Sequence, residues 1–190
     1  MRNSHGYTLI EVVIALAIFA ILGTLSVGVL SRAFDTKARL ATQIEPLNHI
    51  QLAIARITQN AAQIVARPVL NQDIKKTPAF VGNTHSIEFT RGGFISTPTL
   101  KRMALSCEDG NLIQSTWLTL DKFDETPPQQ QILLSQLTQC YFTLLSQDKT
   151  WSDTWGENNT LPAAFKLHLN IKSLGEITPV FIIAGGMHAN

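Results

Sequence analysis

The sequence predicts an α+β protein in which one long N-terminal helix packs on antiparallel β-sheet. Three observations predict this architecture. Residues 6–30 are almost entirely apolar, residues 47–64 carry apolar side chains at helical spacing, and the rest of the chain holds short segments in which apolar and polar residues alternate. The helix therefore has a membrane half followed by an amphipathic half, and the amphipathic half needs a sheet to cover its apolar face.

The N-terminal stretch is long enough to cross a bilayer. Residues 12–30 carry no charged side chain, and as a helix they would be roughly 28 Å long, close to the thickness of the hydrocarbon core. A secretory signal peptide fits poorly, because its apolar core is shorter and ends at a small-residue cleavage site. A plain signal anchor explains the length but not Glu11, whose carboxylate is costly near a membrane unless it is paired.

A specific motif surrounds this glutamate. It comprises Gly6, Tyr7, Thr8, Leu9, Ile10 and Glu11, followed directly by the apolar run. The motif resembles the class III leader junction of type IV pilins and type II secretion pseudopilins, in which a glycine precedes an aromatic residue, usually Phe. Tyr7 departs from that pattern but keeps the ring. The resemblance implies that a prepilin peptidase cuts between Gly6 and Tyr7 and methylates the new amino group of Tyr7.

The resemblance also implies a role for Glu11, which becomes the fifth residue of the mature chain. In the family this glutamate pairs with the N-terminal amine of a neighbouring subunit in a helical filament. Physical chemistry agrees with that role, because a carboxylate in a dry helix bundle is neutralised by desolvation unless a cation lies within a few ångströms. Apolar helices supply contact area, and this one ion pair would supply the register between subunits.

The helix is expected to continue beyond the membrane segment, because charged residues return after Leu30 without a loop-like composition. Pro46 should kink the helix or start a new segment. An apolar stripe follows on one helical face, and Arg67-Pro68 should end the helix. The stripe comprises Leu47, Ile50, Ile54, Ile57, Ala61 and Ile64, and the polar residues mostly off it are Gln51, Arg56, Gln59, Asn60 and Gln63.

The remaining residues predict the sheet. Alternation indicates strands at 86–90 and 103–107, and Asp109-Gly110 predicts a hairpin turn into a strand over 112–120. Residues 165–172 follow strict period two, and a turn at Leu174-Gly175 should return the chain into 177–184. Segment lengths typical of sheets suggest roughly five to seven antiparallel strands.

The pattern after the helix resembles more narrowly the J-type minor pseudopilin of type II secretion. The stretches that carry this resemblance are 67–69, 88–93, 100–105, 117–121 and 161–164, together with Trp151 and Trp155. The resemblance implies a subunit at or near the tip of a pseudopilus that helps to start its assembly for export of folded proteins across the outer membrane. Implied partners are the minor pseudopilins of K, I and H type, the prepilin peptidase and, through the N-terminal helix, the inner membrane.

This resemblance sets the expected organisation of the chain. Residues 1–6 would be the leader peptide, 7–31 the transmembrane and assembly part of the helix, 32–67 its periplasmic amphipathic part, and 68–190 a periplasmic antiparallel β domain. Arg2 is the only basic side chain of the leader, which weakly favours a cytoplasmic leader. The protein is therefore expected to cross the inner membrane once, with its C-terminal domain in the periplasm.

Composition and motifs argue against other classes of function. The chain has 15 Lys and Arg against 14 Asp and Glu, and this balance argues against a nucleic-acid binder. No spacing of histidines, nucleophile motif or phosphate loop indicates a catalytic, cofactor or metal site, so we expect no enzyme and no cofactor. Two alternatives stay open: a minor pilin of a type IV pilus, acting in adhesion, twitching or DNA uptake, and a membrane-anchored periplasmic enzyme.

The chain has two cysteines, Cys107 and Cys140. An oxidising periplasm permits a disulfide between them. Free cysteine is also a common buried hydrophobe, and spacing alone does not prove a bridge. Both interpretations stay open from the sequence.

Overall fold

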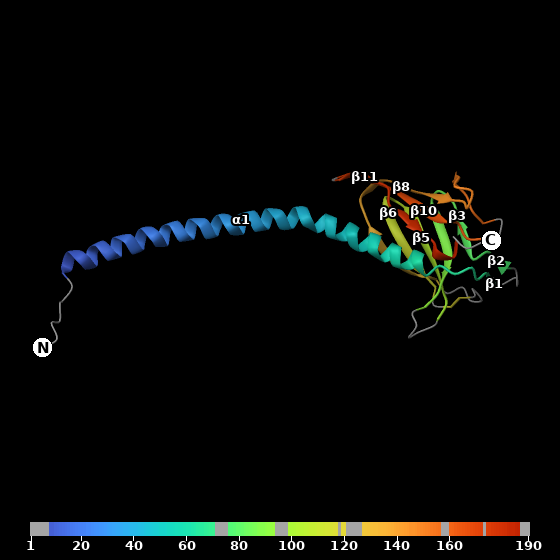
Figure 1. Ribbon diagram of the computed structural model, residues 1–190, viewed down its shortest axis with the longest axis horizontal. Helices are drawn as coiled ribbons and strands as arrows, with labels where there is room; N and C mark the ends of the chain where they lie inside the picture. The colour runs from blue at the N-terminus through green and yellow to red at the C-terminus, as the bar shows by residue number, and fades with distance from the viewer. Residues whose placement is uncertain are drawn as a thin grey trace. The chain divides into compact units, whose positions relative to one another are not determined.

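The computed structural model describes residues 8–70, 76–93, 99–117, 119–120, 127–156, 160–172 and 174–186. The chain divides into two compact units, Met1–Asn48 and His49–Asn190. A single helix, α1 (Leu9–Ala62), begins in the first unit and ends in the second, and the strands follow it (Figure 1). The helix is continuous through Pro46, so a new segment, which was one of the two outcomes predicted for this proline, does not start there.

In the apolar half of α1 two hydroxyl side chains bond to the backbone of their own helix. The Thr24 hydroxyl donates to the carbonyl of Ile21 at 2.9 Å, and the Ser26 hydroxyl donates to that of Leu22 at 2.8 Å. Such bonds let a hydroxyl enter an apolar environment without losing a hydrogen bond. The apolar N-terminal half of α1 can therefore carry these two residues inside a bilayer.

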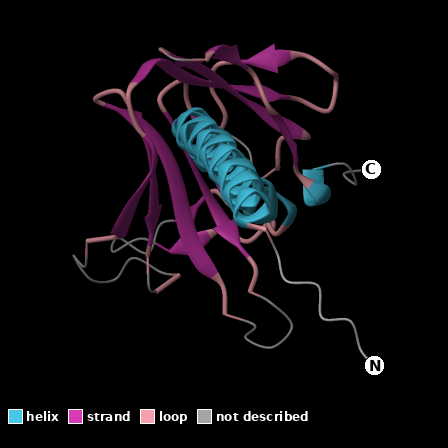
Figure 2. Cartoon of the chain, turned by 90° about the vertical axis from the view of Figure 1, so that its left-hand side faces the viewer, coloured by secondary structure: helices cyan, strands magenta, loops and turns pink. Residues whose placement is uncertain are grey.

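The amphipathic stripe of α1 packs where predicted over most of its length. Ile50, Ala53, Ile57 and Ala61 are buried in the core of the second unit. Leu47 is 42% exposed, which corrects its assignment to the stripe. Strands of the two five-stranded sheets described below lie on two sides of this part of the helix (Figure 2). Burial of each large apolar side chain there is worth about 1.5–3 kcal/mol.

The helix ends at Ala62, before the predicted end at Arg67-Pro68. The chain leaves the helix because its next backbone groups pair with a strand. The Val65 amide donates to the carbonyl of Thr90 at 3.0 Å, and the Gly92 amide donates to that of Gln63 at 2.8 Å. Ile64 and Val65 are β-branched, so an extended conformation suits them better than a further helical turn.

The first sheet has the strand order β3-β4-β5-β6-β7, and all its pairings are antiparallel. Asp109 and Gly110 have positive φ and connect β5 to β6, which confirms the predicted hairpin. The strand after this turn ends at Thr116, before the predicted end at Leu120. The strands are β3 (Phe80–Gly82), β4 (Ser86–Arg91), β5 (Lys101–Glu108), β6 (Asn111–Thr116) and β7 (Gln129–Leu134).

The second sheet has β10 at its centre. This strand alternates between buried and half-buried residues from Phe165 to Ile171, as predicted. The returning chain is split in two at Thr178-Pro179, since proline has no amide to donate to the ladder. The strands are β8 (Leu137–Leu145), β9 (Trp151–Ser152), β10 (Ala164–Ile171), β11 (Gly175–Ile177) and β12 (Val180–Ile182), and β8, β11 and β12 all pair with β10.

The described strands outnumber the predicted five to seven. The two main sheets have five strands each, and β1 (Val69–Leu70) pairs with β2 (Lys76–Thr77) in a third, two-stranded sheet. Strands of two or three residues carry too short a pattern to show alternation, which is why the sequence missed them. A short 3₁₀ helix, Ala184–Gly186, follows β12.

Candidate assembly sites

The N-terminal half of α1 presents apolar side chains on all sides. Leu9–Lys37 is long and apolar enough to cross a membrane by its length and composition, and the side chains described in this stretch are all exposed. Phe19 is 76% exposed and Val29 70% exposed. A helix that is apolar all round needs an apolar environment, either lipid or neighbouring helices. This part of the chain therefore has the length and composition of a membrane anchor.

Glu11 lies in the first turn of this helix. Its Oε2 accepts a long hydrogen bond, 3.4 Å, from the backbone amide of Thr8. This contact places the carboxylate at the helix N-terminus, where the helix dipole favours a negative charge. Gly6 and Tyr7, the predicted cleavage and methylation positions, lie outside the described residues.

An arginine lies in the centre of the second unit. Arg102, on β5, is fully buried, and its Nε donates to Glu88 Oε1 at 2.8 Å. Its Nη1 donates to the carbonyl of Ala79 at 2.9 Å and to the Thr90 hydroxyl at 3.1 Å. A buried guanidinium needs such partners, because desolvating an unpaired charge costs several kcal/mol or more. Arg102 thus joins β4, β5 and the residue that precedes β3 at one point.

A buried amide pair joins the helix to the first sheet. Asn60 of α1 donates through Nδ2 to Gln114 Oε1 on β6 at 3.1 Å, and both side chains are at most 4% exposed. The sequence predicts Asn60 off the apolar stripe, so this burial is a correction. The helical wheel cannot show it, because the partner amide comes from a strand far along the chain.

Cys107 and Cys140 form a disulfide. Cys107 lies on β5 of the first sheet and Cys140 on β8 of the second sheet. Their partly buried side chains pack against the hydrophobic core. The bridge therefore connects the two sheets directly, across 33 residues of sequence separation.

One face of the second sheet carries an exposed cluster of rings. The ring of Tyr141 on β8 stacks on that of His168 on β10, with centroids 4.2 Å apart. Nε2 of His168 lies 3.1 Å from the Thr143 hydroxyl, and Lys166 Nζ lies 4.2 Å from the centre of the Trp151 ring. Burial lowers the pKa of His168, the charge of Lys166 lowers it further, and Glu176 opposes the shift. The sequence places His168 on the solvent side but does not show this stack.

The two tryptophans that help to carry the family resemblance, Trp151 and Trp155, lie in different environments. Trp155 packs against the core, and its indole Nε1 donates to the carbonyl of Thr160 at 2.9 Å. Trp151 is 42% exposed beside Lys166. Within the described ranges, no group of three or more His, Cys, Asp or Glu is arranged to hold a metal ion.

Two family models match the chain. The model described as type II secretion system (T2SS), protein J, matches residues 28–183. The model described as prokaryotic N-terminal methylation motif matches residues 1–27. The second match covers the predicted leader junction, and the first covers most of the helix and the sheets.

Relatives and solved structures agree with these matches. A curated protein from Escherichia coli, type II secretion system protein J, is 24% identical over 198 residues, which cover 97% of this chain and 98% of the relative. Its counterpart from Vibrio cholerae is 25% identical over 201 residues, covering 97% and 90%. One chain of the GspK-GspI-GspJ complex from enterotoxigenic E. coli matches with a TM-score of 0.63 and 21% identity, covering 74% of this chain and 98% of that chain. This likeness shows a shared fold.

Proposed function

The chain belongs to the family of type II secretion system protein J and is a minor pseudopilin, and we propose that it acts at or near the tip of a pseudopilus. There it would help to start pseudopilus assembly for the export of folded proteins across the outer membrane. The observation that carries this proposal is an exposed apolar helix joined to a folded β domain. Such a chain can pack its helix into a filament and present its domain to partners.

We propose that the N-terminal half of α1 anchors the protein in the inner membrane, with the β domain in the periplasm. Residues 1–6 would be removed as a leader peptide, and the new N-terminus, Tyr7, would be methylated. Residues 7–31 would form the membrane and assembly segment, 32–67 the connection to the sheets, and 68–190 the periplasmic domain. The disulfide between the sheets supports this placement, because disulfides persist in an oxidising compartment.

Glu11 would set the register of the helix in the pseudopilus. It lies in the first turn of α1, so a neighbouring N-terminal amine in staggered register could reach it. Loss of water in the helix bundle would strengthen this ion pair. The pair would stabilise one relative position of two subunits, whereas apolar packing alone tolerates several.

The proposed partners are the minor pseudopilins of K, I and H type. The GspK-GspI-GspJ complex contains a chain of the same fold as this one. By analogy, the β domain would contact the K- and I-type subunits, while α1 packs among the helices of the pseudopilus. The prepilin peptidase would process the chain before assembly. The family match favours this role over that of a type IV pilus minor pilin.

A clean deletion tests the proposed function. Deletion strains carrying no gene, the wild-type gene or the Glu11→Ala gene would be compared for secreted proteins in the medium, for surface pili and for DNA uptake. We expect secretion to fail in the deletion strain with pili and uptake intact, and wild type to restore it. Normal secretion with lost pili or uptake would contradict the proposal.

A further inference from the structure

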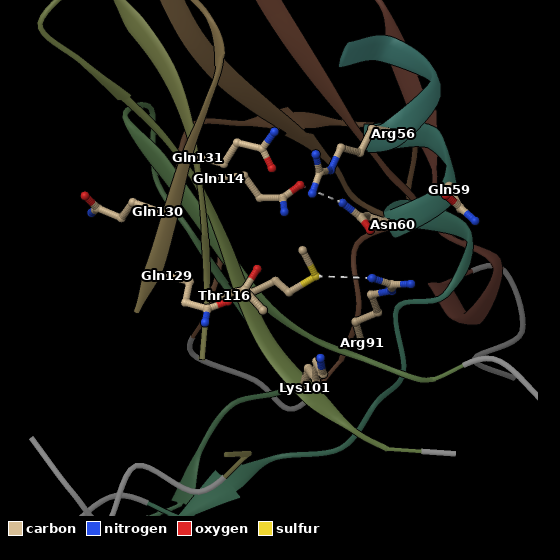
Figure 3. A pocket seen from close by; sticks show the side chains of 11 residues that line it. Arg56, Gln59, Asn60, Arg91, Lys101, Gln114, Thr116, Gln129, Gln130 and Gln131 are labelled. Carbon is tan, nitrogen blue, oxygen red and sulfur yellow. Dashed lines mark hydrogen bonds between the residues drawn. The ribbon is translucent and has the colours of Figure 1, made fainter. Parts of the chain in front are cut away.

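A polar pocket lies between the C-terminal part of α1 and the first sheet, within the second unit. Its volume is about 590 Å³. Figure 3 shows Arg56, Asn60 and Arg91 on one side, Lys101 at one end, and the glutamines of β6 and β7 on the other side. Strand register explains this grouping, because Arg91 pairs with Lys101, and Gln114 pairs with Gln131. Their side chains therefore share the face of the sheet that the helix covers.

The pocket concentrates positive charge. Arg56, Arg91 and Lys101 line it, and none of the described lining residues is acidic. Arg91 Nε donates to Gln63 Oε1 at 2.6 Å, which holds this guanidinium in place. Burial lowers the pKa of Arg91, and the charge of Arg56 lowers it further. The like charges therefore repel each other, and a bound anion would relieve this repulsion.

Neutral amides complete the pocket. Asn60 and Gln114 are fixed by their mutual hydrogen bond, and Gln129 and Gln131 are exposed at the rim. Amides both donate and accept hydrogen bonds. A surface that mixes cations with amides suits a peptide, whose carboxylates and main chain together offer acceptors and donors. The balanced charge of the whole chain does not favour a nucleic acid or an anionic lipid surface.

Strand β7 forms the rim and is an open sheet edge. In the described part of the chain β7 pairs with β6 and with no further strand. Its residues Gln129 to Ile132 are exposed, and none is charged. An uncharged edge strand is a template for pairing with another chain. This edge strand lies directly beside the polar pocket, because Gln129, Gln130 and Gln131 of β7 line it.

We propose that β7 and the pocket together bind an acidic peptide segment of another protein subunit. The segment would pair its main chain with β7, and Asp or Glu side chains on one face would point into the pocket toward Arg56. Arg91 and Lys101, farther from β7, would add to the positive potential that attracts these carboxylates. This inference rests on the proposed function, since it names the chemistry of one partner contact. The carboxylates of the peptide would fix its orientation and make binding selective for acidic sequences. The main-chain hydrogen bonds would attach the peptide to β7 as an added strand.

The test uses the full chain purified in detergent. A fluorescent octapeptide of alternating Thr and Glu is titrated by anisotropy beside a matched peptide with Gln in place of Glu. We expect the Glu peptide to bind more tightly than the Gln peptide by about tenfold or more. Alternate N-methylation of the Glu peptide should also weaken binding, because it removes donors for pairing with β7. Equal binding of the Glu and Gln peptides, or full binding of the N-methylated one, would overturn the proposal.

Protein variants locate the site. Arg56→Gln combined with Lys101→Gln should weaken Glu-peptide binding by about tenfold. Lys149→Gln combined with Lys172→Gln, which removes two exposed lysines outside the pocket, is the matched control and should leave binding unchanged. Equal loss in both variants, or displacement of the peptide by inorganic phosphate at equal concentration, would overturn the assignment. Because this binding assay is separate from the secretion assay, failure of the pocket and failure of the proposed function remain distinguishable.

Discussion

At the scale of single residues, the second unit depends on a buried charge. Arg102 is fully buried, whereas its partner Glu88 remains 28% exposed. Nη2 of Arg102 has no hydrogen-bond partner within the described residues, which adds to the cost of burial. The hydrogen bonds to Glu88, Ala79 and Thr90 therefore offset the cost of burying Arg102. Loss of one partner should destabilise the first sheet.

We predict that Glu88→Leu costs about 3 kcal/mol of unfolding free energy, because Arg102 then keeps a buried charge without its carboxylate. Glu88→Leu combined with Arg102→Met should recover part of this loss, since the buried charge is gone. Urea unfolding of the four proteins of this double-mutant cycle measures the coupling. A double variant less stable than both single variants would contradict this account.

His168 should make stability depend on pH. Its folded pKa is lowered, mainly by burial and next by Lys166. As pH falls through the usual histidine pKa of about 6.5, the unfolded chain takes up a proton that the folded chain resists, so stability falls until the folded pKa is passed. Lys166 on the same strand, Glu176 on β11 and Tyr141 on β8 face the ring.

The measurement is the urea midpoint of wild type and His168→Gln at about pH 7.5 and about pH 5. The wild type should lose more stability on acidification than the variant. Equal losses would mean that other groups cause the pH dependence.

Residue roles were predictable only where the local pattern carries them. The alternation of residues 165–172 correctly separates the core side of β10 from the side that bears His168. Arg102 and Asn60 were not predictable as buried, because their partners are fixed by strand register and helix packing over long sequence separations. The pocket was missed for the same reason, since its residues come from one helix and four strands.

At the scale of elements, the first turn of α1, which contains Glu11, is expected to control incorporation into the pseudopilus. We predict that Glu11→Ala leaves leader cleavage intact and reduces incorporation into the pseudopilus, because it removes the proposed partner of the neighbouring N-terminal amine. Glu11→Asp, which keeps the charge on a shorter side chain, should retain part of the incorporation. Gel mobility of the processed form and co-assembly with partner subunits provide the measurements. Co-assembly of Glu11→Ala at the wild-type level would contradict this role of Glu11.

The disulfide joins the two sheets and should stabilise the second unit. Closing a loop across 33 residues of separation is worth about 3–4 kcal/mol by loss of chain entropy in the unfolded state. We predict that Cys107→Ala combined with Cys140→Ala lowers unfolding free energy by about this amount. Urea unfolding with reductant should give the wild type the same unfolding free energy as the double variant. The bridge would be contradicted if reductant left the wild-type unfolding free energy unchanged and both thiols could be labelled without reductant.

The elements themselves were largely predictable. The turn residues Asp109-Gly110 gave the β5–β6 hairpin, and the apolar stripe gave the buried face of α1 from Ile50 to Ala61. Boundaries were not predictable where tertiary pairing competes with local preference. Residues 63–65 leave the helix because Thr90 and Gly92 bond to them, and Pro179 interrupts the returning strand in a way that periodicity does not register.

At the scale of the whole molecule, the chain has two compact units that are stabilised by different environments. The first unit presents an apolar helix that is satisfied only by lipid or other helices. The second unit has its own core, a disulfide and an open sheet edge, and so can fold around its own contacts while it offers a surface to partners. This division suits a subunit that is held by its helix and recognised by its domain.

We propose that this chain assembles with other minor pseudopilins. The most direct measurement is native mass spectrometry of the full chain co-expressed with the K- and I-type minor pseudopilins of the same organism. We predict a complex that contains all three subunits, and a weaker one with Glu11→Ala. A stable complex of the other two subunits, from which this chain is absent at every concentration tested, would contradict the account.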